Sequence, residues 1–123
     1  AIKIAAEVIH VSKSEGYEIT NINGISADEY LEAASGNKIE ELKNKFLEAA
    51  KLAGSASRPS FGQDVLKKRR TEVDYLTGYV SRIGEKNNIE TPICDKITAI
   101  VNDLGVGFDP SPNHLDQIEK IIN

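Results

Sequence analysis

Two polar side chains, Ser60 and Glu72, stand at positions where they could bind an anionic or polar ligand. Ser60 follows Pro59, and proline is favoured in the first turn of a helix. A serine there commonly caps the helix, but the backbone N–H groups of a helix start also suit a carboxylate. Glu72 lies in the first turn of another predicted helix, where acids complement the helix dipole. Each residue therefore has a structural and a functional interpretation.

A run of four basic residues (KKRR, 67–70) lies between these two positions. Cations near the end of a helix complement the negative end of its dipole, which is the structural interpretation. The same positive charges could hold a phosphate, which is the functional interpretation. The pattern alone leaves both open.

The remaining candidates for chemistry favour structural roles. Cys94 is the single cysteine of the chain, and the favoured interpretation is a small buried apolar residue. His10 and His114 are far apart and have no cysteine or histidine at ligand spacing, so we expect no metal site. The glycines of GVG at 105–107 follow a predicted helix rather than a strand, which argues against a dinucleotide-binding loop.

The composition is typical of one globular domain. The chain has 123 residues and a mass of 13.4 kDa, with 40% hydrophobic and 28% charged residues. A formal net charge of −4 argues against nucleic-acid binding as the main function, because such proteins carry a basic excess. The apolar runs are too short to span a membrane, and a single cysteine suits the reducing cytoplasm. We therefore predict a cytoplasmic protein with no nucleic-acid or membrane partner.

Helical periodicity dominates the first half of the chain. Apolar residues at a spacing of 3.6 predict an amphipathic helix at the start of the sequence. Ser26 and Glu29 have the spacing of a capping box, which predicts the beginning of a second helix. Asn37 is the expected N-cap of a third helix. The expected helix stops are Gly16, Gly36 and Gly54.

The second half also has helical patterns. Four helices are expected here, at 60–68, from Thr71 to 87–88, from Asp95 to Gly105, and at 114–122. Pro92 disfavours helical backbone at the residue before it, so 89–93 should be extended. No segment of useful length alternates with a period of two, so we expect no strand. The prediction is an all-α fold of six or seven helices in a single domain, residues 1–123.

Three blocks of sequence carry a family resemblance: PSFGQDV at 59–65, TEVDYLTGYV at 71–80 and IETP at 89–92. Together they resemble the C-terminal domain of ketopantoate reductase (2-dehydropantoate 2-reductase), and the spacing from Ser60 to Glu72 agrees with the family without a gap. The resemblance implies a helical bundle like the C-terminal domain of 6-phosphogluconate-dehydrogenase-like reductases. The tail from Gly105 onward has no clear counterpart.

The resemblance also implies an activity and roles for five residues. Enzymes of this family transfer a hydride from NADPH to the keto carbon of a 2-oxo acid, 2-dehydropantoate, and so make pantoate for pantothenate biosynthesis. By resemblance, Ser60 would bind the substrate carboxylate through its hydroxyl and backbone N–H. Phe61, Gly62 and Gln63 would line the same site. Glu72 would contact the cofactor near the nicotinamide ribose, or hold substrate and cofactor in register.

Two parts of the family pattern have no counterpart in this sequence. The N-terminal Rossmann domain is missing, and so is the long helix that carries the catalytic lysine and its neighbouring asparagines. We therefore expect a truncated C-terminal domain with no catalytic residue of its own, inactive alone and a poor binder of NADPH, whose partner is the Rossmann domain. The alternative is a non-enzymatic helical interaction module, in which an exposed apolar seam pairs the chain with a second copy as a homodimer.

Overall fold

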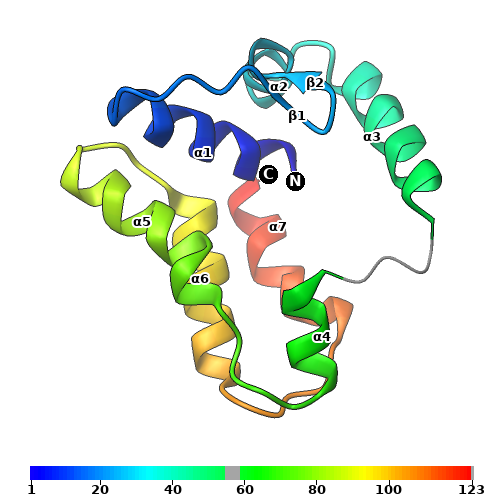
Figure 1. Cartoon of the computed structure of the whole chain (residues 1–123), viewed down its shortest axis with the longest axis vertical. Coiled ribbons are helices and arrows are strands. Elements are labelled where there is room, and N and C mark those ends of the chain that lie inside the picture. The colour runs from blue at the N-terminus through cyan, green and yellow to red at the C-terminus, as the bar shows by residue number, and fades with distance from the viewer. Residues whose placement is uncertain (55–58, 123) are drawn as a thin grey trace. The chain divides into compact units, whose positions relative to one another are not determined.

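The fold is largely helical, as the sequence predicts. In the computed structural model, which describes residues 1–54 and 59–122, these residues form seven α-helices, two 3-10 helices and a two-stranded hairpin (Figure 1). They fall into two compact units, one within Ala1–Ser57 and one within Arg58–Asn123. The all-α prediction is confirmed, whereas the prediction of one domain stays a prediction. The segment 54–59 (GSASRP) is small and polar and is therefore expected to be a loop, but most of it lies outside the described residues.

The first unit packs three helices beside a short hairpin. Its elements are α1 (Ile2–Ser14), β1 (Asn21–Ile22), β2 (Ile25–Ser26), α2 (Ala27–Ala34) and α3 (Ile39–Ala53). Both α1 and α3 pack against α2, so α2 is the centre of the unit. The buried core is made of Ile9, Ile25, Ala27, Tyr30, Ala33 and Leu42. The burial of these apolar side chains is what holds the three helices together.

The hairpin contradicts the prediction that the chain has no strand. Its register pairs Asn21 with Ser26 and Ile22 with Ile25, so each strand has only two residues. Alternation with a period of two cannot be recognised in so short a segment. The turn nevertheless has a clear sequence signal, because Asn-Gly favours a two-residue hairpin turn in which both residues have positive φ. Asn23 and Gly24, at 53° and 78°, have that backbone.

The start of α2 is the capping box that the sequence predicts. The backbone N–H of Glu29 donates to Ser26 Oγ over 3.2 Å, and the backbone N–H of Ser26 donates to Glu29 Oε2 over 3.0 Å. The Glu29 carboxylate also forms an ion pair with Lys45 of α3. The Lys45 ammonium, together with the N–H and hydroxyl of Ser26, lowers the pKa of Glu29 from 4.5 to about 2.

We expect an NMR titration of the Glu29 carboxyl to give a pKa of about 2. Because this pKa is lowered in the folded chain, the carboxylate stabilises the fold above its ordinary pKa of 4.5, and the contribution is lost as the pH falls towards 2. Lys45→Ala should raise the pKa of Glu29 more than Ser26→Ala does. Lys43→Ala, which removes the partner of Glu40 on the same helix, is the control and should not change it. An ordinary pKa in the wild-type chain would contradict the prediction.

The N-cap of α3 is Lys38 rather than Asn37, so that prediction is wrong by one residue. The backbone N–H of Asn37 donates to the Glu32 carbonyl oxygen over 3.0 Å, which makes Asn37 part of the end of α2. Gly36 precedes it with φ at 97°, the left-handed backbone that favours glycine at a helix end. Asn37 thus belongs to the end of α2 and is not the N-cap of α3.

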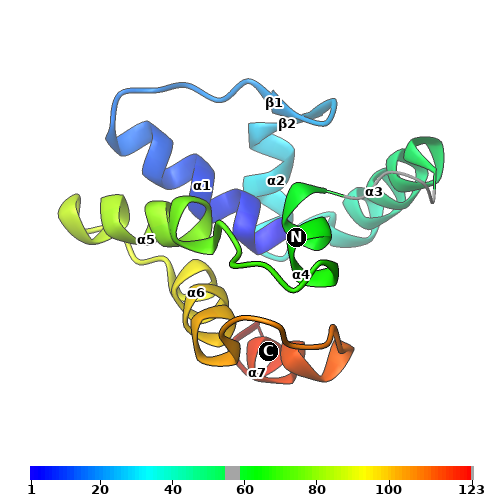
Figure 2. The same cartoon turned by 60° about the horizontal axis from the view of Figure 1, so that its bottom comes forward.

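The second unit is built on a pair of adjacent helices. Its elements are α4 (Ser60–Leu66), η1 (Val73–Tyr75), α5 (Thr77–Lys86), α6 (Pro92–Leu104), η2 (Pro112–Leu115) and α7 (Asp116–Ile122). α5 packs against α6, and α7 packs against another part of α6, as Figures 1 and 2 show. Ile93, Cys94 and Ile100 of α6 are buried. No helix among the described residues is both long and apolar enough to cross a membrane.

The helix expected from Thr71 begins six residues later than predicted. Residues 73–75 form the single 3-10 turn η1, and Leu76 then leaves helical backbone with φ −104° and ψ −101° before α5 starts at Thr77. Glu72 therefore lies on a short turn and not in the first turn of a long helix. Val73, Leu76, Val80 and Ile83 have the spacing of an apolar seam on the expected helix, but Leu76 is 47% exposed.

The beginning of α6 also differs from the prediction. The helix starts at Pro92, with Thr91 as its N-cap, and not after Asp95. Proline suits the first helical position because it has no N–H to leave unpaired there. The Thr91 hydroxyl donates to Oδ1 of Asp95 over 2.9 Å. Gly105 ends the helix with φ at 67°, as predicted.

Candidate functional site

The two predicted binding residues Ser60 and Glu72 are joined by a hydrogen bond. The Ser60 hydroxyl donates to Oε1 of Glu72 over 2.7 Å, although twelve residues separate them. Ser60 is the first residue of α4, and Glu72 immediately precedes η1. The N-cap of α4 is Pro59, and no side chain caps the helix. The interpretation of Ser60 as a helix cap is therefore wrong, and its hydroxyl holds the Glu72 carboxylate instead.

This pair brings two kinds of binding group together on an exposed surface. A carboxylate accepts hydrogen bonds and so suits a ligand that carries hydroxyl groups. The first N–H groups of a helix have no partner within that helix, and they suit a ligand carboxylate. Both side chains are exposed, so a ligand can reach them. Ser60 and Glu72 thus combine an acceptor for hydroxyls with the start of a helix.

The structure separates two other predicted site residues from this pair. Phe61 and Gly62 line an apolar groove, together with Val65 and Leu66 of the same helix. A rotation of about 100° per residue puts these four on one side of α4 and Ser60 on the opposite side. Gln63 is three residues after Ser60, on the Ser60 side of the helix, and is exposed. The predicted site thus divides into a polar and an apolar part.

The apolar groove has a volume of about 680 Å³ and lies between α4, α6 and the C-terminal part of the chain. Its other walls are Ile97, Ile100, Val101 and Leu104 of α6 and residues of the segment from Phe108 to Ile118. Leu66 and Leu115, at its edge, are 51% and 56% exposed. The ring of Phe108 meets that of His114 edge to face, with the ring centres 5.8 Å apart.

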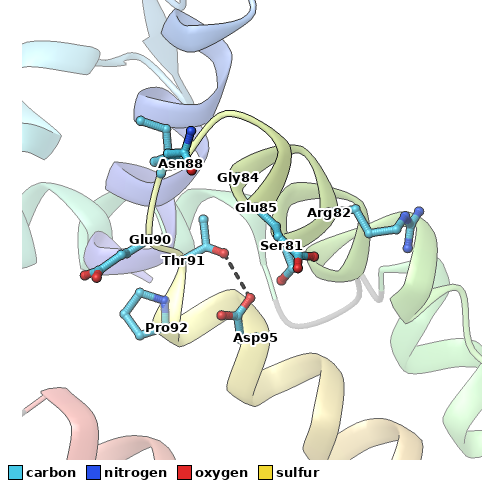
Figure 3. A pocket seen from close by; sticks show the side chains of 10 residues that line it. Ser81, Arg82, Gly84, Glu85, Asn88, Glu90, Thr91, Pro92 and Asp95 are labelled. Carbon is cyan, nitrogen blue, oxygen red and sulfur yellow. Dashed lines mark hydrogen bonds between the residues drawn. The ribbon is translucent and has the colours of Figure 1, made fainter.

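A polar pocket that the sequence analysis does not predict lies between the end of α5 and the start of α6 (Figure 3). It measures about 910 Å³, and its lining includes Ser81, Arg82, Glu85 and Glu90. The hydrogen bond from Thr91 to Asp95 lies on its wall. The segment that borders it includes the IETP block at 89–92, in which Pro92 begins α6. The lining residues carry both signs of charge, and no geometry here defines a reaction.

The basic run supports the fold locally. Lys68 Nζ pairs with Asp109 Oδ1 over 3.1 Å and donates to the Gly107 carbonyl oxygen over 3.2 Å. Arg70 pairs with Asp74 over 3.6 Å. Two of the four cations are thus engaged with acceptors of the second unit. This arrangement favours the structural interpretation of the run over a phosphate site.

Cys94 and the possible metal ligands are the remaining candidates. Cys94 is completely buried in α6, in agreement with its interpretation as a small buried residue. Within 1–54 and 59–122, no three His, Cys, Asp or Glu side chains gather closely enough to hold a metal ion.

Comparison with known proteins decides the family. The family model described as "Ketopantoate reductase PanE/ApbA C terminal" matches residues 1–105. The chain belongs to this family. The match covers Ser60 and Glu72. It ends at Gly105, where the tail that has no clear counterpart in the family begins. It also covers α1, upstream of the three motif blocks.

Several curated 2-dehydropantoate 2-reductases are similar to the chain. The enzyme of Lactococcus lactis subsp. lactis is 51% identical over 45 residues, which cover 36% of this chain and 14% of that protein. The enzyme of Vibrio cholerae serotype O1 is 38% identical over 72 residues, covering 58% and 24%. The enzyme of Streptococcus pyogenes serotype M1 is 28% identical over 106 residues, covering 82% and 28%. The chain thus spans 14–28% of the length of these relatives. No solved structure matches it.

The family match covers only part of the apolar groove. Residues 106–122 lie outside the match, and they supply Phe108, His114, Leu115 and Ile118 to the groove wall. The Ser60–Glu72 pair lies wholly inside the match. The family match therefore includes the polar pair and the α4 and α6 walls of the groove, but not the wall formed by residues 106–122.

Proposed function

We propose that this chain is the substrate-binding helical part of an NADPH-dependent reductase that converts 2-dehydropantoate, or a similar 2-oxo acid, to the 2-hydroxy acid. Membership of the ketopantoate reductase family supports the reaction class. The observation that carries the proposal is the 2.7 Å hydrogen bond between Ser60 and Glu72. It joins the residue that the resemblance assigns to the substrate to the residue that it assigns to the cofactor. The proposal includes a cytoplasmic location and an N-terminal Rossmann domain as partner.

The two polar residues have different roles in this proposal. The Ser60 hydroxyl proton points to Glu72, so the N–H groups at the start of α4 are the donors best suited to the substrate carboxylate. Glu72 is exposed, and its carboxylate suits the hydroxyls of the nicotinamide ribose. Gln63 lies on the same side of α4 and contributes a polar contact, whereas Phe61 and Gly62 contribute an apolar wall.

NADPH would supply the hydride that reduces the keto carbon. The residues of this chain would hold the substrate carboxylate and one end of the cofactor so that the keto carbon faces the hydride donor. The alkoxide that forms needs a proton, and the resemblance assigns that step to a lysine of the long helix for which the sequence analysis finds no counterpart here. We propose no catalytic residue and no metal ion for this chain.

The test uses the parent reductase, meaning the longer polypeptide that the proposal implies. Purified parent reductase is mixed with NADPH and 2-dehydropantoate, and the loss of NADPH absorbance is followed. We expect turnover by the parent reductase and none by the 123-residue chain. A panel of other 2-oxo acids then ranks substrates by kcat/KM. A parent reductase that reduces no 2-oxo acid would contradict the proposal.

One observation favours a second candidate, a non-enzymatic interaction module. The apolar groove beside α4 exposes Leu66 and Leu115, and exposed apolar surface favours association. In this case the chain would form a homodimer through the groove. Light scattering of the wild-type chain and of Leu66→Gln distinguishes the two: a wild-type dimer that becomes monomeric in the variant supports the module, and a wild-type monomer contradicts it.

A further inference from the structure

We propose that Asp74 and Asn102 are positioning residues that hold the Glu72 carboxylate in its place beside Ser60. The inference rests on the proposed function, because positioning has meaning only if Glu72 contacts a ligand. It adds two residues to which neither the sequence nor the family match assigns a role. Neither is expected to touch the substrate.

The local backbone around Glu72 does not fix this residue by itself. η1 is a single 3-10 turn, and the backbone breaks at Leu76 before α5 begins. Its internal support is the hydrogen bond from the Tyr75 N–H to the Glu72 carbonyl oxygen, at 2.9 Å. Short 3-10 turns have poorer hydrogen-bond geometry than α-helices. Contacts from other elements must therefore determine where this turn lies.

Asp74 receives those contacts from two neighbouring helices. The Asn102 side chain of α6 donates from Nδ2 to Asp74 Oδ1 over 2.9 Å. The Arg82 guanidinium of α5 donates from Nη1 to the Asp74 carbonyl oxygen over 2.9 Å. Arg70 pairs with the other carboxylate oxygen of Asp74 over 3.6 Å. Asp74, two residues after Glu72, thus connects the turn to both α5 and α6.

The Asp74–Asn102 bond has the properties of a positioning contact. Asn102 is exposed and the Asp74 side chain is 35% exposed, so losing one hydrogen bond between them should change overall stability little. Overall stability comes instead from buried apolar side chains, among them Val73, which is only 3% exposed. A small displacement of a binding group can nevertheless strongly reduce turnover.

A reciprocal exchange of the two side chains tests the inference. Asn102→Asp places two carboxylates against each other, and we expect it to lower kcat/KM of the parent reductase about tenfold with an unchanged melting temperature. The double variant Asp74→Asn/Asn102→Asp restores the bond with donor and acceptor exchanged, so it should recover to within about twofold of wild type. Asn113→Asp in η2, with the same change of charge, is the matched control and should have no effect.

A second readout keeps the two proposals separate. Amide hydrogen exchange of Tyr75, measured on the 123-residue chain, reports the turn without any activity. We expect it to become about tenfold faster in Asn102→Asp and to return to the wild-type rate in the double variant. If the wild-type parent reductase reduces no 2-oxo acid, the proposed function fails, and the exchange rate alone decides whether Asn102 holds the turn. An unchanged rate, an unchanged kcat/KM in an active enzyme, or no recovery in the double variant would overturn the inference.

Discussion

Replacing Glu72 by alanine is expected to lower kcat/KM of the parent reductase by well over tenfold, and Ser60→Ala should also lower it by well over tenfold. A hydrogen bond that involves a charged group is worth about 1.5–3 kcal/mol, which corresponds to roughly a ten- to hundredfold change in kcat/KM. Glu72→Ala removes the proposed contact to the ribose, and Ser60→Ala releases the carboxylate that its hydroxyl holds at 2.7 Å. Steady-state kinetics with NADPH and 2-dehydropantoate measure both effects.

Two further variants make this prediction specific. Glu72→Gln keeps an oxygen that accepts from Ser60 but has no charge. We therefore expect its kcat/KM to lie between those of wild type and Glu72→Ala. Glu119→Ala removes an exposed acid of α7, outside the family match, and should leave the kinetics unchanged. Wild-type kinetics in both Glu72→Ala and Ser60→Ala would mean that the pair only supports the local fold.

The elements that could be predicted from the sequence are those determined by a few neighbouring residues. The capping box of Ser26 and Glu29 needs only two side chains three residues apart, and it forms as predicted. Gly54 and Gly105 end helices because their positive φ is a local property of glycine. The Asn-Gly hairpin turn is equally local, and its signal was available although the strands themselves were too short to recognise.

The turn that carries Glu72 could not be predicted, because distant residues determine it. Local spacing favours a continuous helix from Thr71, and an N-cap and an apolar seam are both present in the sequence. The actual backbone breaks at Leu76, where Arg82 and Asn102 hold the Asp74 that precedes the break. A pattern read along the sequence contains no information about such contacts across 8 and 28 residues.

The candidate site could also be predicted only in part from the sequence. The resemblance assigns Ser60 to the substrate and Glu72 to the cofactor, and the hydrogen bond between them makes the two side chains neighbours. The same resemblance grouped Phe61 and Gly62 with Ser60, but the helical rotation of α4 turns them towards the apolar groove. Adjacent residues on a helix face different directions, so a motif written as consecutive letters can include residues of two surfaces.

Gly84→Ala is expected to destabilise the second unit by about 2 kcal/mol, which is within the range for overpacking. An added Cβ would lie 2.7 Å from the Ile89 carbonyl oxygen and 2.9 Å from Thr91 Cγ2. The first of these neighbours is backbone that cannot rotate away. The Ile89 N–H also donates to the Gly84 carbonyl oxygen over 2.8 Å, so moving the loop would break this bond and displace Thr91, the N-cap of α6. The gain in helix propensity from alanine, about 1 kcal/mol, is too small to compensate for this.

Gly62→Ala is the matched control, because the same substitution in the interior of α4 meets no atom within 4 Å. Neither glycine has a positive φ, so the two variants differ in the space around the new methyl group and not in backbone strain. We expect Gly62→Ala to raise the free energy of unfolding by about 0.5–1 kcal/mol, the usual benefit of alanine over glycine in a helix. Urea unfolding of the 123-residue chain, followed through amide signals of the second unit, measures both changes. Equal effects in the two variants would contradict the close approach of the 87–91 loop to α5, and with it the geometry of the polar pocket that this loop borders.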